Sequence, residues 1–197
     1  MQDVLDEADR LVLIELASTT LLQSLKHHPD DTTWVRDLDL SWVPTRLTRP
    51  GASFVTLERD GRLLGCIGTL RAYQPLALDV VTHTLDAAYR DPRFSGITSD
   101  DVHALDIEIS LLGDMQPCEA QGFAELQRAL RPYIDGVFIR SQLRRGTLLP
   151  SVWDDLPDPN QFIEALWRKA GIPPGVWPDD LEVSTYEVEK IVGKGPR

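Results

Sequence analysis

The segment from Gly61 to Leu70, GRLLGCIGTL, constrains the fold of this chain more than any other. It is typical of a β-strand, yet Gly65 and Gly68 interrupt it. A glycine within a strand loses backbone entropy and offers no side chain for packing. Strands accept such glycines where a backbone, a ligand or a bulge comes close. Cys66 lies between the two, so we expect a closely approached strand that carries a thiol.

The residues around this strand predict an α+β fold with a mostly antiparallel sheet flanked by helices. Residues 52–58 and 62–70 are typical of one hairpin, and residues 136–140 and 145–150 of another. Apolar and polar residues alternate over 104–112, which is typical of a half-buried strand. The remaining patterns predict helices over 3–28, from Pro75 to the Asp91-Pro92 stop, over 121–131 and over 158–170, and a last strand over 181–192.

Length favours one domain over residues 1–197, because 197 residues can enclose one generous core. We expect that core to be continuous. A Pro-containing loop near residues 42–50 is the only candidate for a boundary between two subdomains. A fold with a smaller second lobe is therefore the alternative to a single domain.

Charge and composition limit the kinds of molecule that this chain can bind. The formal net charge is −11, from 31 acidic and 20 basic residues, which argues against binding to nucleic acid or an anionic membrane. No apolar run approaches the roughly 18 residues of a membrane span, and the first ten residues are acidic, unlike a signal peptide. We therefore expect a cytoplasmic protein in which Cys66 and Cys118 are free thiols.

Several motifs occur in a characteristic order: GCIGTL, then DPRF at Asp91–Phe94, EISLL at Glu108–Leu112, LLPSVW, LPDP and RKAG. From about Gly51 to Ile191 the chain resembles the AMMECR family, whose bacterial and archaeal members are often called AmmeMemoRadiSam system protein A. The resemblance implies an α+β fold of two subdomains and a gene neighbourhood shared with a Memo-like protein and a radical-SAM protein. It implies no known reaction.

One position departs from that resemblance. The family's strand usually has an arginine before its glycine, and Leu64 stands there in this chain. If the arginine serves an anionic ligand, its charge is missing here. Arg62 lies two residues earlier, on the same face of a regular strand, and is the candidate replacement.

Cys66 and Glu108 are the candidate catalytic residues. The thiol suits a nucleophile, a carrier of a modification or a soft metal ligand, but a small buried apolar side chain would occupy the same place. Glu108 faces away from the apolar side of its strand, as a general base or ligand would. An outward carboxylate on a half-solvated sheet explains Glu108 equally well.

The candidate ligand-binding residues lie on the glycine-containing strand and at the later hairpin: Arg62, Gly65, Gly68, Thr69, Arg144 and Arg145. Paired arginines can hold a phosphate or carboxylate through bidentate bonds, or they form a solvated hairpin end. The spacing of His and Cys residues predicts no metal site, and no sequence motif specifies a cofactor.

Three functions remain open. The first is an enzyme or substrate-handling component of a Memo- and radical-SAM-linked modification system that uses Cys66. The alternative is a non-catalytic module that binds a partner protein or a nucleotide along Gly65–Gly68. The third is an obligate oligomer that associates through Trp34, Trp42 and Trp153. The sequence itself does not specify the oligomeric state.

Overall fold

The Gly65–Gly68 segment lies in a four-stranded sheet whose strand order is β10-β5-β2-β3. The sheet consists of β2 (Ser53–Arg59), β3 (Arg62–Gly68), β5 (Asp106–Leu112) and β10 (Val188–Lys194). An Asp60-Gly61 turn joins β2 to β3, and both turn residues have the positive φ values, 52° and 74°, that a tight hairpin requires. Because β3 is the last strand in the order of this sheet, it is an edge strand.

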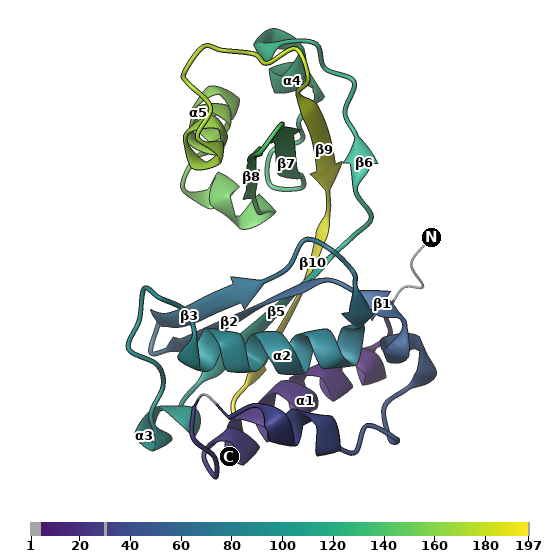
Figure 1. Ribbon diagram of the computed structural model, residues 1–197, viewed down its shortest axis with the longest axis vertical. Helices are drawn as coiled ribbons and strands as arrows, with labels where there is room; N and C mark the ends of the chain where they lie inside the picture. Colours follow the sequence, from purple (N-terminus) through teal and green to yellow (C-terminus); the bar gives the residue numbers. More distant parts are fainter. Residues whose placement is uncertain (1–4, 30, 197) are drawn as a thin grey trace. The chain divides into compact units, whose positions relative to one another are not determined.

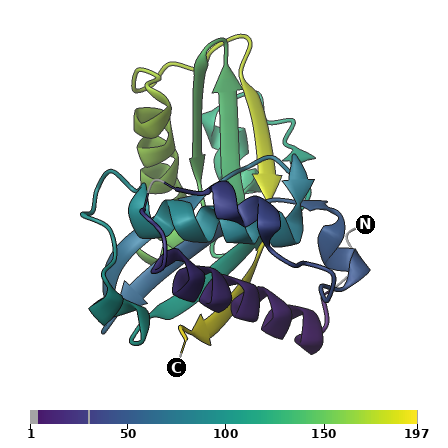
Figure 2. The same ribbon diagram turned by 60° about the horizontal axis from the view of Figure 1, so that its bottom comes forward.

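Helices cover one face of this sheet. α2 (Leu76–Tyr89) packs on β2 and β3, and α1 (Glu7–Ser24) packs on α2 and β5. Figure 1 shows both helices on the same side of the sheet, and Figure 2 shows them side by side. Within the first unit, no described helix covers the opposite face, which we call the helix-free face.

The structure is a computed structural model that describes residues 5–29 and 31–196. These described residues form two units, one over residues 5–29, 31–112 and 189–196, and the other the inserted segment Gly113–Val188. Shorter elements of the first unit are η1 (Thr33–Asp37), η2 (Thr45–Thr48), α3 (Ser99–Val102) and the two-stranded ladder of β1 (Pro50–Gly51) with β4 (Gln74–Pro75).

The second unit has its own sheet, in the order β6-β9-β7-β8. Its elements are β6 (Gln116–Pro117), α4 (Phe123–Ala129), β7 (Gly136–Ser141), β8 (Arg144–Leu148), η3 (Pro150–Asp154), α5 (Pro159–Ala170) and β9 (Glu182–Tyr186). α5 packs against β7 and β8. It begins after the N-cap Asp158 and ends at Gly171, whose φ is 72°.

The α+β class and the mostly antiparallel pairing are confirmed. The predicted helices and both hairpins are present, with ends shifted by a few residues; the expected helix start at Asp3 lies outside the described residues. The last predicted strand is instead two strands, β9 and β10, which belong to different sheets.

The division between the units does not fall in the loop near residues 42–50. It falls after Leu112 and after Val188, whereas residues 42–50 lie within the first unit, with Leu47 fully buried. The expected continuous core is likewise two separate clusters of buried side chains, one in each unit. Each sheet therefore supports its own core.

Candidate functional site

A β-bulge decides which way Cys66 points. Across the hairpin, Gly65 lies opposite Leu57 and Leu63 opposite Glu58, so Leu64 is an extra residue without a partner in β2. Such an extra residue reverses the alternation of faces along the strand. Leu64 packs against the helix-covered core, and Cys66, two residues later, contacts Thr56 on the helix-free face.

The two glycines are explained by the protein's own backbone. A Cβ at Gly65 would lie 1.9 Å from the carbonyl oxygen of Ala87 in α2. A Cβ at Gly68 would lie 2.3 Å from the Ser53 carbonyl oxygen and from the Phe54 ring. Of the reasons expected for these glycines, close backbone approach and a bulge are therefore both present.

A row of polar side chains crosses the helix-free face. Thr56 on β2 pairs with Cys66 on β3 and with Glu108 on β5. The Thr56 hydroxyl donates a hydrogen bond to Cys66 Sγ at 3.2 Å, and Lys190 Nζ on β10 lies 3.5 Å from Glu108 Oε2. We call these four residues the polar row. It brings the two predicted catalytic residues to one surface.

Cys66 and Glu108 are nevertheless not in direct contact. They lie two strands apart, and neighbouring strands are spaced about 4.8 Å, so their backbones are about 10 Å apart. A carboxylate at that distance cannot take the thiol proton directly. A bound molecule lying across Thr56 would instead reach the thiol at one end and the carboxylate at the other.

The backbone of Cys66 is held from outside the sheet. Its N–H donates to Asp91 Oδ2 at 2.9 Å, and its carbonyl oxygen accepts a bond from Arg93 Nη2 at 3.2 Å. On an edge strand these groups point away from β2, where a further strand would otherwise pair. Asp91 and Arg93 thus occupy the place of that strand beside Cys66. We call this pair the edge clamp.

The clamp is itself strongly bonded. The Asp91 side chain is only 2% exposed, and it accepts bonds from Arg93 Nη2 at 2.6 Å and Nε at 2.9 Å. Hydrogen bonding from Arg93 outweighs the effect of burial and holds the pKa of Asp91 well below its usual range, with a contribution from the Cys66 N–H. The carboxylate therefore stays charged at neutral pH.

The clamp joins two of the motifs noted in the sequence, since Cys66 belongs to GCIGTL and Asp91 and Arg93 belong to DPRF. The AMMECR1 family model matches residues 14–191. The chain belongs to the AMMECR1 family.

Individual relatives of this AMMECR1-family chain match most of its length. A protein of Aeropyrum pernix is 35% identical over 188 residues, 92% of this chain and 78% of that protein. One from Thermotoga maritima is 34% identical over 151 residues, 75% of this chain and 82% of that protein. The crystal structure of an uncharacterised Pyrococcus horikoshii protein covers 98% of this chain and 99% of its own, at a TM-score of 0.80 and 24% identity. That likeness establishes the fold.

Local sequence patterns in this AMMECR1-family chain do not predict the clamp. They indicate only that Asp91 ends a helix and that Arg93 belongs to the DPRF motif. The available signal was local: an aspartate directly after a helix, with an arginine two residues later on the same loop. What the sequence lacks is any sign that this loop returns to the edge of β3.

The other strand residues are not gathered at the thiol. Arg62 is exposed at the start of β3, opposite Arg59, and Leu64 is partly buried and packs against the core. The guanidinium beside Cys66 is that of Arg93. Arg62 lies on the other side of the bulge, opposite Arg59, and its role in binding an anion stays a prediction. The Thr69 N–H donates to the Ser53 carbonyl oxygen at 3.0 Å, which continues the pairing beyond Gly68.

Arg144 and Arg145 lie on β8 of the second unit, and both are exposed. They are therefore in a different unit from Cys66. Trp153, which was expected at an oligomer interface, is instead fully buried, and its ring stacks on Phe162 with the centroids 3.7 Å apart. It is a core residue of the second unit and cannot serve as an exposed contact.

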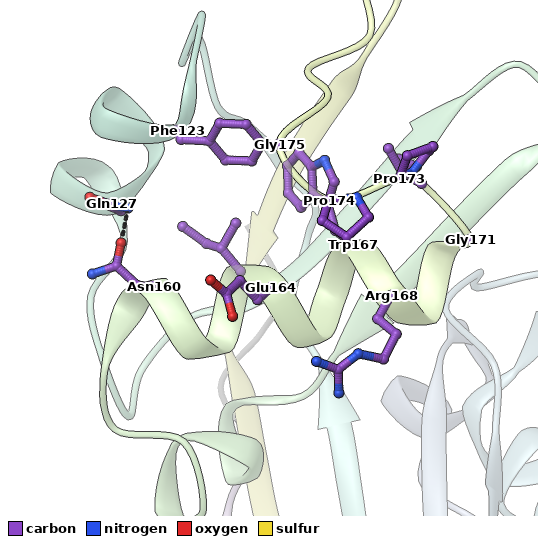
Figure 3. A pocket seen from close by; sticks show the side chains of 12 residues that line it. Phe123, Gln127, Asn160, Glu164, Trp167, Arg168, Gly171, Pro173, Pro174 and Gly175 are labelled. Carbon is purple, nitrogen blue, oxygen red and sulfur yellow. Dashed lines mark hydrogen bonds between the residues drawn. The ribbon is translucent and has the colours of Figure 1, made fainter.

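A cavity of about 560 Å³ opens in the second unit of this AMMECR1-family chain, between α4, α5 and the turn that follows α5. Figure 3 shows Phe123 and Pro174 above the surface of α5, with Gln127 and Asn160 at one end and Arg168 nearby. The volume suits a compact, largely apolar ligand. No predicted site residue lines the cavity.

Among the described residues, no group of three His, Cys, Asp or Glu side chains is arranged to hold a metal ion. None of the described helices has the length and apolar character that a membrane crossing needs.

Proposed function

We propose that the polar row is a thiol site through which this AMMECR1-family protein handles a substrate, in the cytoplasm, together with a Memo-like protein and a radical-SAM protein. The observation that carries the proposal is the placement of Cys66. Its side chain is partly exposed, its sulfur accepts a hydrogen bond from Thr56, and the edge clamp fixes its backbone. The connection to the two partner proteins rests on the family resemblance alone.

The order of residues in the polar row suggests a separate chemical role for each of them. The Cys66 sulfur would add to an electrophilic, double-bonded carbon of the substrate. The π bond would break and its electron pair would move to the far atom, which takes a proton from water in place of the proton that the thiol releases to water. Glu108, about 10 Å away across β2, and Lys190, one strand further on β10, would hold the polar end of the same molecule. Ser110 Oγ donates to Glu108 Oε1 at 3.2 Å, which fixes that carboxylate.

The alternative function, binding of a partner along Gly65–Gly68, is restricted by the clamp. A peptide cannot pair with the backbone of Cys66 while Asp91 and Arg93 occupy it. A partner would have to bind the side chains of the helix-free face instead. Substituting valine for Gly65 or Gly68 would not test this, because the new side chain would collide with Ala87 or Phe54 and disturb the fold.

The test is to look for a covalent adduct on Cys66. The protein would be produced together with the Memo-like and radical-SAM proteins of its own gene neighbourhood, quenched in acid and analysed by peptide mass spectrometry. We expect a mass increase on the peptide that contains Cys66. Glu108→Gln should reduce it, and Cys118→Ser should leave it unchanged.

Cys118 serves as the internal control, because it is also a partly exposed free thiol but lies in the second unit. An increase of equal size on the Cys118 peptide would show general thiol reactivity. No increase on either peptide would also contradict the proposal.

A further inference from the structure

The hairpin between β7 and β8 ends in an exposed leucine. Ser141 pairs with Arg144, so Gln142 and Leu143 form the two-residue turn. Leu143 is 100% exposed. A leucine in that position contributes no burial to the fold, so its side chain is free to pack against another molecule.

The turn is strained and yet fixed. Gln142 has a φ of 51°, a conformation that favours glycine at the first position of a two-residue turn. The Asp180 carboxylate accepts bonds from the Ser141 hydroxyl at 2.7 Å and from the Gln142 N–H at 3.0 Å. A neighbouring side chain thus holds the tip in one conformation, which lowers the entropy lost on binding.

Two unpaired positive charges stand directly beside the leucine. Arg144 and Arg145 are exposed, and neither forms an ion pair with a residue of the described parts of the chain. Their neighbour Arg140, by contrast, pairs with Glu182 at 2.6 Å. Successive residues of a strand point to opposite faces, so the two guanidinium groups flank the tip.

We propose that this tip, composed of Leu143, Arg144 and Arg145, binds an acidic segment of a partner protein. Carboxylates of the partner would form bidentate bonds with the arginines, and an apolar side chain between them would pack on Leu143. The rest of the chain, with a net charge of −11, would repel such a segment, so binding would be confined to the tip. The proposal does not depend on the thiol site.

The same features argue against a membrane as the occupant. Binding to anionic lipid typically uses clusters of four to eight basic residues, and this tip has two. A single leucine also buries too little apolar surface for stable anchoring. A protein partner therefore fits the tip better than a lipid surface does.

The experiment is an NMR titration of the isotope-labelled full-length protein. The probe is the acetylated and amidated peptide Asp-Glu-Leu-Phe-Asp-Glu, and the control peptide carries Asn and Gln in place of the acids. We expect saturable amide shifts centred on residues 140–146 with the acidic peptide only. Leu143→Asn and the double variant Arg144→Gln with Arg145→Gln should each weaken binding about tenfold, the loss of one strong contact.

Arg128→Gln is the matched control, because Arg128 is an exposed arginine of the same unit outside the tip, and we expect unchanged affinity. Four results would overturn the proposal: no shifts at millimolar peptide, equal shifts with the control peptide, shifts centred elsewhere, or unchanged affinity in the tip variants. Leu143-dependent sedimentation with phosphatidylserine vesicles would assign the tip to membranes instead. Leu143-dependent dimerisation in gel filtration would assign it to a second copy of the chain.

Discussion

Position 65 requires glycine because an atom of α2 lies where the β-carbon of any other residue would be. The carbonyl oxygen of Ala87 occupies the place where a β-carbon would stand, 1.9 Å from it, so no other residue fits without moving α2 away from β3. Cys66 is the next residue of the strand and therefore lies on the opposite face, beside Thr56. At the scale of single residues, the thiol site therefore depends on a packing contact beneath it.

Gly65→Ala should destabilise the protein by about 2–3 kcal/mol, because overpacking a tight contact forces the backbone to shift. Urea denaturation would measure the change. Gly122→Ala is the comparison, since nothing lies within 4 Å of its β-carbon position. It should lose no more than about 1 kcal/mol, the effect of alanine at a helix N-cap. Equal losses in both variants would show that Gly65 is not closely packed.

Asp91→Asn should destabilise the protein in a pH-dependent way. The pKa of Asp91 is depressed by Arg93, so its charge stabilises the fold above the ordinary pKa of 3.8, and the stabilisation is lost as the pH falls below that value. The urea midpoint of the variant should lie below that of the wild type at pH 7, and the two should converge between about pH 4 and pH 2. A constant gap would contradict a charged clamp.

At the scale of elements, α2 carries a buried charge cluster on one of its faces. His83 is 6% exposed, and its ring nitrogens lie 3.4 Å from Asp79 and 3.6 Å from Asp86. Burial alone would lower the pKa of His83, but the two carboxylates outweigh it and raise the pKa to about 9. The ring is therefore positively charged at neutral pH and balances the two acids.

His83→Gln tests that charge. A histidine with a raised pKa stabilises the fold fully below its ordinary pKa of 6.5, and the stabilisation is lost as the pH rises through about 9. We expect a loss of about 3 kcal/mol at pH 6, typical of a broken buried ion pair. The difference from the wild type should shrink steadily up to pH 10. Denaturation at each pH would show it, and a difference that stays constant would exclude a charged imidazole.

Local sequence patterns predict most of these helices and strands, but they do not predict how the elements are connected and paired. The hairpins follow from alternation and from turn residues such as Asp60-Gly61, and α5 follows from Asp158 and Gly171 at its ends. The bulge at Leu64 cannot be predicted from local patterns, because it depends on the register between β2 and β3. Simple alternation places Arg62 and Cys66 on one face, and the bulge separates them. The edge clamp cannot be predicted locally either, because the loop with Asp91 and Arg93 is distant in sequence from Cys66.

At the scale of the whole molecule, the second unit is an insertion between β5 and β10. The chain passes from the first unit to the second after Leu112 and returns after Val188, within a stretch that alternates like a single strand. Nothing in that alternation marks the change of sheet at Glu187. Both ends of the insertion meet, as the Gly113 N–H donates to the Glu187 carbonyl oxygen at 2.9 Å.

The fragment 113–188 should therefore fold alone. It contains its own core, in which Trp153 stacks on Phe162 and both side chains are fully buried. We expect a cooperative thermal transition in near-ultraviolet circular dichroism, and its loss in Phe162→Ala, a change that typically costs about 3–5 kcal/mol. A fragment without a cooperative transition would show that its core depends on the first unit.

The most direct test of the thiol site is iodoacetamide labelling of the native protein at pH 8, with Cys66 and Cys118 followed separately by peptide mass spectrometry. We expect that Cys66 is labelled in the folded protein, and that Thr56→Val and Asp91→Asn change its labelling rate while the rate of Cys118 stays the same. If Cys66 is labelled only after denaturation, the Gly65–Gly68 strand serves packing alone, and the proposed thiol function is wrong.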